Sequence, residues 1–123
     1  MPADLRSFLE LLDARGLLLR VEREVDPATE AARLMREVEL RDRAVLCSSV
    51  RGSALSLAYN LVGSRAALAL ALGVEPSRVR ERFRGGLEQR IEPVIVDDAP
   101  VHEVVTEGDD ADLSRLPLVT HSE

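Results

Sequence analysis

Side chains that could hold a metal ion gather toward the end of this 123-residue sequence. His121 lies two residues before Glu123 and follows Asp112 by one short segment, and imidazole and carboxylate groups are common ligands of divalent metals. A His and a Glu two residues apart on an extended segment are an unspecific signal. A loop bordering another domain, with His121 bonded to backbone, explains the same residues. We therefore assign no metal ligand here.

Acidic residues are dense just before that segment, at 97–98 and 107–112. A calcium loop of the EF-hand type needs ligands at alternating positions, a glycine at its sixth position and a closing glutamate. Gly108 precedes the acids instead of following them, and no glutamate closes the loop. We expect solvated turns and helix caps.

Two further candidates for chemistry are a possible acid/base pair and a possible nucleophile. His102 and Glu103 are adjacent, and on the strand expected there adjacent side chains point to opposite faces, so the two should not converge. Cys47 has no histidine near it in sequence and lies on a strand that reads as buried, which favours an inert thiol.

Two segments have the residue types for binding an anion. Residues 63–65 stand at a junction between a strand and a helix, where a helix N-terminus binds anions, but capping by Ser64 explains them equally well. Arginines recur between 78 and 84 without sharing one helix face, and Glu81 lies among them. For 63–65 we expect capping, with an anion or interdomain contact through Arg65 as the alternative. For 78–84 we expect a solvated or ion-paired helix, with an interdomain or subunit surface as the alternative. The residues alone thus give no catalytic, cofactor-binding or metal site.

Composition limits the remaining classes of function. The net charge is −6 and only 2% of residues are aromatic, which disfavours nucleic-acid binding. The sequence contains no lysine, which excludes Schiff-base chemistry by this chain. One cysteine, no signal-peptide pattern and no apolar run of the roughly 20 residues that span a bilayer predict a cytoplasmic protein without a membrane span.

Periodicity predicts one α+β (α/β) domain over residues 1–123, with a mixed β-sheet and flanking helices in two or three layers. Expected helices are 5–14, capped by Asp4 and ended by Gly16, and 27–41, opened by Asp26 and Pro27. A third is 65–72, capped by Ser64. A fourth opens at 75–77, with Val79 and Phe83 buried, and Gly85 and Gly86 break or end it. Expected strands are 17–21, 44–50, 55–61, 94–96 and 101–106, the second and third forming a hairpin.

Blocks of the sequence resemble, in order, the N-terminal domain of the UbiD family of carboxy-lyases. The blocks are residues 4–12 with Gly16, 24–27, 50–53, 60–65 with 70–73, 100–105, 108–113 and 116–121. They cover nearly the whole chain. Cys47, Ser48 and His102 depart from the residues common in the family, outside the motifs that carry the resemblance.

The resemblance implies a reversible decarboxylation of aromatic or α,β-unsaturated acids with prenylated FMN, a divalent metal, usually manganese, and often potassium. In the family a Glu-Arg-Glu set near the flavin lies downstream of the segment that corresponds to 116–121. The resemblance therefore carries no catalytic, cofactor-binding or metal-binding residue over to this chain. It also implies a homo-oligomer for the complete enzyme.

The sequence stops within a family motif, so we expect a front domain without its flavin-binding split barrel and C-terminal domain, inactive alone and packed against the flavin domain. The alternative is a non-enzymatic accessory subunit that docks onto a separate flavin-binding chain. A third interpretation, an unrelated small-ligand module, requires the block matches to be coincidence.

Overall fold

A three-stranded mixed sheet forms the centre of the protein in the computed structural model, which describes residues 1–89 and 91–120. The strands β1 (Leu18–Val21), β2 (Ala44–Cys47) and β3 (Leu57–Tyr59) lie in the order β1-β2-β3. β1 runs parallel to β2, with Leu18 opposite Ala44, and β3 runs antiparallel to β2, with Tyr59 opposite Val45. The predicted mixed sheet and the hairpin of its second and third strands are confirmed.

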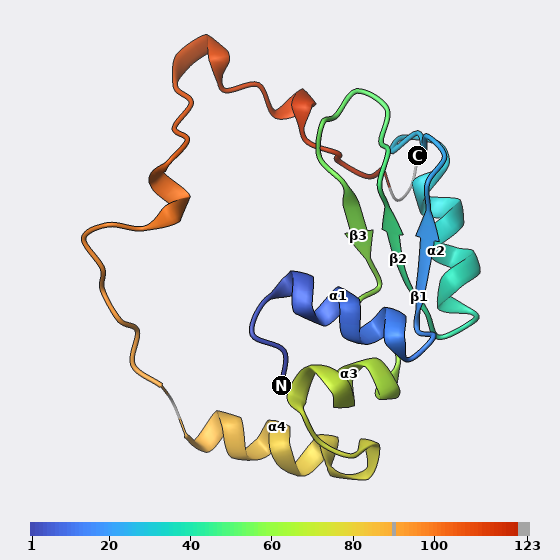
Figure 1. Cartoon of the computed structure of the whole chain (residues 1–123), viewed down its shortest axis with the longest axis vertical. Coiled ribbons are helices and arrows are strands. Elements are labelled where there is room, and N and C mark those ends of the chain that lie inside the picture. The colour runs from blue at the N-terminus through green and yellow to red at the C-terminus, as the bar shows by residue number, and fades with distance from the viewer. Residues whose placement is uncertain (90, 121–123) are drawn as a thin grey trace.

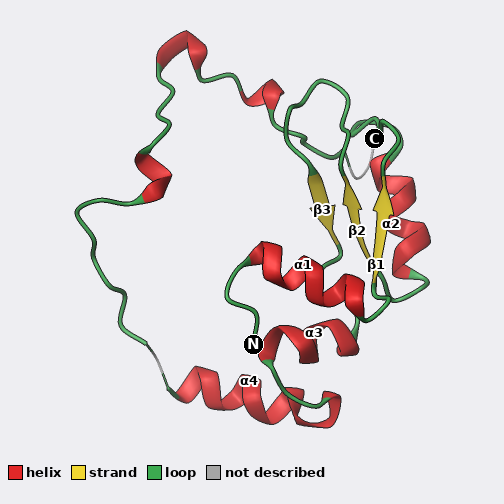
Figure 2. Cartoon of the chain, in the orientation of Figure 1, coloured by secondary structure: helices red, strands yellow, loops and turns green. Residues whose placement is uncertain are grey.

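Helices cover both faces of this sheet, as Figures 1 and 2 show. Alternate residues of a strand point to opposite faces, and two apolar clusters follow this rule. One contains Val45 and Cys47 and packs against α2 (Ala31–Glu39); the other contains Leu18 and Ala44 and packs against α1 (Leu5–Ala14) and α3 (Arg65–Leu72). The result is an α+β domain with three layers, one of the two layer numbers that the sequence left open.

The first helix begins and ends as predicted. The Asp4 carboxylate accepts a hydrogen bond from the backbone N–H of Ser7 at 2.8 Å, and the Ser7 hydroxyl accepts one from the N–H of Asp4 at 3.1 Å. This reciprocal pair satisfies two donors that a helix start otherwise leaves open. Gly16 follows with φ +68, a left-handed conformation that favours glycine and ends the helix.

The second helix begins later than predicted. Asp26 accepts the N–H of Ala28 and of Thr29, but residues 27–30 form turns, and α2 starts only at Ala31. The N–H groups of Glu30 and Ala31 both bond to the Asp26 carbonyl. Asp26 and Pro27 therefore close a turn ahead of the helix instead of starting the helix itself.

The fourth helix departs from the sequence prediction in two ways. After a short 3₁₀ turn (Pro76–Arg78), α4 (Val79–Glu88) runs through Gly85 and Gly86 without a break. Val79 is buried as predicted, but Phe83 is 60% exposed. Only the start of α4 packs against its neighbours, and the rest of the helix extends past α3 (Figure 1).

Beyond α4 the chain forms a long extended segment that we call the arm, residues 91–112. The predicted strands 94–96 and 101–106 are absent from it, because the arm leaves the sheet and pairs with none of the described strands. The arm instead contains short 3₁₀ turns at Pro100–His102 and Gly108–Asp110 and otherwise lies in solvent. In Figure 1 it is the orange segment that swings away from the sheet. A third such turn, Leu113–Arg115, begins the segment that returns to the sheet.

Candidate functional site

Charged side chains are concentrated where the parallel strands β1 and β2 end. The carboxyl ends of parallel strands lie at the same edge of a sheet, which is where open α/β sheets place their sites. The loops after the two strands are joined by a bridge between Val25 and Val50, both buried. The bridge brings residues 24–27 and 50–53 together across a wide gap in sequence.

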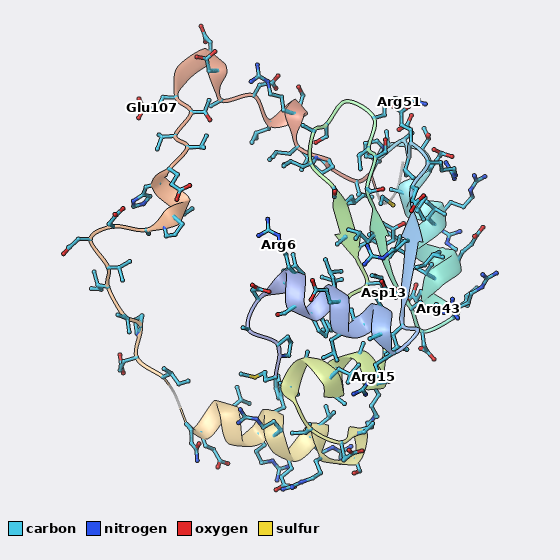
Figure 3. All side chains as sticks on the ribbon, in the orientation of Figure 1. Arg6, Asp13, Arg15, Arg43, Arg51 and Glu107 are labelled. Carbon is cyan, nitrogen blue, oxygen red and sulfur yellow. The ribbon has the colours of Figure 1, made fainter. Side chains whose placement is uncertain are left out.

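Arg51 links the two loops through two carboxylates. Its Nε lies 3.1 Å from Glu24 Oε1, and its Nη1 lies 2.9 Å from Asp26 Oδ2. Glu24 and Asp26 together raise the pKa of Arg51. Arg51 is labelled in Figure 3, at the sheet edge from which these loops emerge.

Asp26 and Glu30 complete this group, which we call the edge cluster (Arg23, Glu24, Asp26, Glu30 and Arg51). Glu30 Oε2 accepts the N–H of Asp26 at 3.0 Å, and its Oε1 lies 3.1 Å from Arg23 Nη1. The Ala28 N–H, bonded to the Asp26 carboxylate, lowers the pKa of Asp26, and the Asp26 N–H lowers the pKa of Glu30. Both carboxyls are therefore held ionised.

The C-terminal segment returns to this same edge of the sheet. The Ser53 hydroxyl donates to the carbonyl of Arg115 at 2.7 Å, and the N–H of Thr120 donates to the carbonyl of Pro27 at 3.3 Å. Val119 packs against the apolar cluster on the α2 side of the sheet. The chain thus leaves the fold after α4 and comes back beside the edge cluster (Figure 1).

The edge cluster can hold loops together but offers no group for acid/base work. A general acid needs a proton near neutral pH, whereas the pKa values of Asp26 and Glu30 are lowered. Arginine and backbone N–H groups occupy their oxygens. We interpret the cluster, together with the Ser53–Arg115 and Thr120–Pro27 bonds, as a clasp that fixes the two loops and the returning segment.

Sequence reasoning did not predict this clasp, although several of its residues lie in the blocks that resemble the family. Blocks 24–27 and 50–53 carry part of the family resemblance, and 116–121 carries another part. Each is weak alone, and nothing in the linear order says that they meet at one edge of the sheet. The signal that could have found them is the alternation of opposite charges at the ends of two expected strands.

The metal and calcium candidates near the C-terminus do not form a site among the described residues. His121 and Glu123 lie outside those residues. The Asp112 carboxylate accepts the N–H of Ser114 at 2.8 Å, and bonds from Ser114 lower its pKa. Within 1–89 and 91–120, no three His, Cys, Asp or Glu side chains converge to hold a metal. The described residues offer no ligand set that fits the divalent metal that the resemblance implies, so no step through a metal is derived.

His102 and Glu103 lie on a 3₁₀ turn and its end, so the argument from a strand was wrong. Both side chains are exposed. The predicted strand is missing here, and the exposed pair has no buried setting to tune it for proton transfer.

Cys47 is fully buried, as the sequence suggested, and burial raises the pKa of its thiol. The Tyr59 hydroxyl lies buried beside it without a hydrogen-bond partner among the described residues, and burial also raises the pKa of Tyr59. A protonated, inaccessible thiol is a poor nucleophile. This pair is part of the core.

The two anion candidates are held by contacts within the chain. Ser64 Oγ accepts the N–H of Ala67 at 3.1 Å, which confirms its capping role. Arg65 Nη1 donates to the carbonyl of Pro76 at 3.3 Å. Arg78 pairs with Glu81 at 3.0 Å on an exposed surface, as expected of an ion-paired helix.

No helix among the described residues is long and apolar enough to cross a membrane.

The family model for the 3-octaprenyl-4-hydroxybenzoate carboxy-lyase N-terminal domain matches residues 9–84. This chain belongs to the UbiD N-terminal domain family. The match begins within α1, takes in α2, α3, the sheet and the first part of α4, and ends before the arm.

Relatives of this UbiD domain are much longer than the chain itself. An uncharacterized protein of the cooM 5′ region of Rhodospirillum rubrum is 34% identical over 98% of this chain but only 26% of its own length. The UbiD-class enzyme HmfF from Pelotomaculum thermopropionicum, solved in complex with FMN, is 31% identical, with a TM-score of 0.84 over 97% of this chain and 27% of its own. Vanillic acid decarboxylase from Sedimentibacter hydroxybenzoicus, with a truncated VdcD component, is 31% identical, with a TM-score of 0.81 over 98% and 28%. The chain thus spans about a quarter of the length of these relatives.

Proposed function

We propose that residues 1–123 are the N-terminal structural domain of a prenylated-FMN-dependent decarboxylase of aromatic or α,β-unsaturated carboxylic acids. The observation that carries this proposal is the match of nearly the whole chain to the front quarter of UbiD-class enzymes at TM-scores above 0.8. One of those enzymes is solved with FMN, and a second structure of it holds prenylated FMN. The domain's role is to pack against the flavin-holding part and to fix its own C-terminal segment in place.

In this proposal the flavin, the metal and the catalytic groups belong to the part of the enzyme outside these 123 residues. Manganese and potassium serve the complete enzyme, a cytoplasmic homo-oligomer. The edge cluster supports this division, because its carboxylates are occupied by arginines and backbone N–H groups and are not free to hold a cation.

A second candidate is a separate accessory subunit that docks onto a flavin-binding chain. The vanillic acid decarboxylase that matches this domain is named with two components, C and D, which shows that an enzyme of this class has more than one chain. In the first candidate this domain is covalently joined to the flavin-holding part, and in the second it is a separate chain. Both candidates require that this domain has a surface that docks onto the flavin-holding part.

The test is to purify the 123-residue chain, supply prenylated FMN and a divalent metal, and measure bound flavin and release of CO₂ from aromatic and α,β-unsaturated acids. We expect no stoichiometric flavin and no turnover. Either one would show that the chemistry resides in this chain and would contradict the proposal.

A further inference from the structure

The arm exposes apolar side chains that a solvated segment has no reason to carry. Seven aliphatic residues in it are between 58% and 94% exposed: Ile91, Val94, Ile95, Val96, Val101, Val104 and Val105. Large apolar patches on a soluble protein mark surfaces that a partner covers. All seven are β-branched, the residue type most favoured in strands.

The sequence pattern indicates strands buried on both faces. Val94, Ile95 and Val96 are consecutive, and alternate residues of a strand face opposite sides, so both sides of this short strand would be apolar. Val104 and Val105 are also adjacent, so both sides of a strand over 101–106 would be apolar there. Residues 97–100 between the segments contain Pro100 and two aspartates, which suits a turn.

The arm's course is set from outside this chain. Among the described residues its hydrogen bonds are local, within the 3₁₀ turns. Yet the superposition on HmfF takes in 97% of the chain, which leaves too few residues out to omit the arm. A segment with so few contacts of its own follows the path that it has in a complete enzyme, where the other three-quarters of the chain surrounds it.

Charge limits what can cover the arm. Residues 91–112 carry eight carboxylates and no lysine or arginine, whereas the net charge of the entire chain is only −6. Two such arms paired with each other would bring like charges together, which is unfavourable. Figure 3 shows Glu107 far out on the arm, away from Arg51 and the other labelled arginines.

We propose that residues 94–96 and 101–106 add as strands to a β-sheet in the flavin-holding part of the enzyme, at a surface with apolar pockets and a basic rim. In such strand addition, main-chain hydrogen bonds supply affinity and side-chain pockets supply specificity. The inference rests on the proposed function and names the element that joins this domain to its partner. The edge cluster and the Ser53–Arg115 bond then fix where the arm returns.

The test compares backbone amide exchange in the isolated 123-residue chain with exchange in the native species purified from its source cells. We expect amides of 94–96 and 101–106 to exchange freely in the isolated chain and to slow by at least about a hundredfold in the native species. Equal exchange in both samples would overturn the proposal. Slow exchange in an isolated chain that sediments as a dimer would assign the arm to a second copy and overturn it as well.

A pair of matched variants separates pairing from general damage. Val104 is 82% exposed in the arm, and Leu40 is 85% exposed at the end of α2. In the native species we expect Val104→Lys to cut the protection of 101–106 at least about tenfold, because a buried strand cannot accept the charge, whereas Leu40→Lys leaves it unchanged. In the isolated chain neither variant should shift the unfolding midpoint. Equal effects of the two variants on protection would contradict strand addition.

Mass and flavin content of the same native sample keep the two proposals apart. A flavin-bearing species with an unprotected arm overturns this inference and leaves the proposed function standing. A flavin-free species of 13.5 kDa overturns both.

Discussion

The residues that shape this domain act by fixing chain direction. Asp26 is the clearest case, because its carboxylate accepts two backbone N–H groups, its own N–H is bonded to Glu30, and its second oxygen meets Arg51. Arg51, by comparison, contributes through its side chain only the ion pairs with Glu24 and Asp26, and that side chain is 63% exposed. Exposed ion pairs contribute little to stability, whereas a cap to backbone N–H groups contributes more.

We therefore expect Asp26→Ala to lower the midpoint of urea unfolding of the 123-residue chain clearly, and Arg51→Ala to lower it less. Asp98→Ala, in the solvated arm, should leave it unchanged. Urea titration followed by circular dichroism measures all three. If Arg51→Ala were the most damaging, the clasp would depend on charge instead of on the turn.

Acid should weaken the domain. Asp26 and Glu30 have pKa values below their ordinary 3.8 and 4.5. A carboxyl with a lowered pKa in the folded state contributes stability that is complete above the unfolded pKa and is lost as pH falls through the folded pKa. The same sign holds for Asp4, Glu81 and Asp112.

The free energy of unfolding should thus be level above about pH 5 and fall between there and about pH 2. The double variant Asp26→Asn with Glu30→Gln should start lower and fall less steeply over that range. Urea titrations at stepped pH values give both slopes. A wild-type chain that gained stability on acidification would show that these carboxyls are not held as described.

At the scale of elements, sequence reasoning succeeded where a local signal decides the structure. The Asp4 and Ser64 caps, the left-handed Gly16, and the hairpin after β2 all follow from short-range chemistry. It failed where the deciding contact is absent from the segment itself. Phe83 has the spacing of a buried residue but is 60% exposed, and 94–96 and 101–106 have strand composition but pair with no described strand.

Glycines in α4 and after α3 give opposite expectations. Gly85 and Gly86 lie inside α4, and an added Cβ would meet nothing within 4 Å at either. Replacing either with Ala should stabilise the isolated chain by about 0.5–1 kcal/mol, because glycine loses more backbone freedom in a helix.

Gly73 has φ +66, and an added Cβ would lie 3.1 Å from the Met1 nitrogen. Gly73→Ala should therefore destabilise the chain, by about 1 kcal/mol or more. Thermal unfolding of the three variants checks the signs. Destabilisation by Gly85→Ala or Gly86→Ala would mean that α4 is not the continuous helix described above.

At the scale of the whole molecule, the chain divides into a packed domain and an extended arm, for which we propose a partner. The family match ends at residue 84, close to the boundary between the packed domain and the arm. The sequence could predict the mixed sheet with flanking helices and the family, because both depend on patterns within the chain. It could not predict the clasp, which depends on three distant blocks meeting at one sheet edge.

The central claim is that this domain works as one part of a flavin-dependent decarboxylase, with the chemistry elsewhere. The most direct measurement is the mass and flavin content of the native species captured from its source cells with an antibody raised against these 123 residues. The account predicts a species well above 13.5 kDa that carries stoichiometric flavin. In that species the domain is either the front quarter of a chain about four times its length, as in its relatives, or a subunit bound to a flavin-holding chain. A flavin-free protein of 13.5 kDa would contradict it.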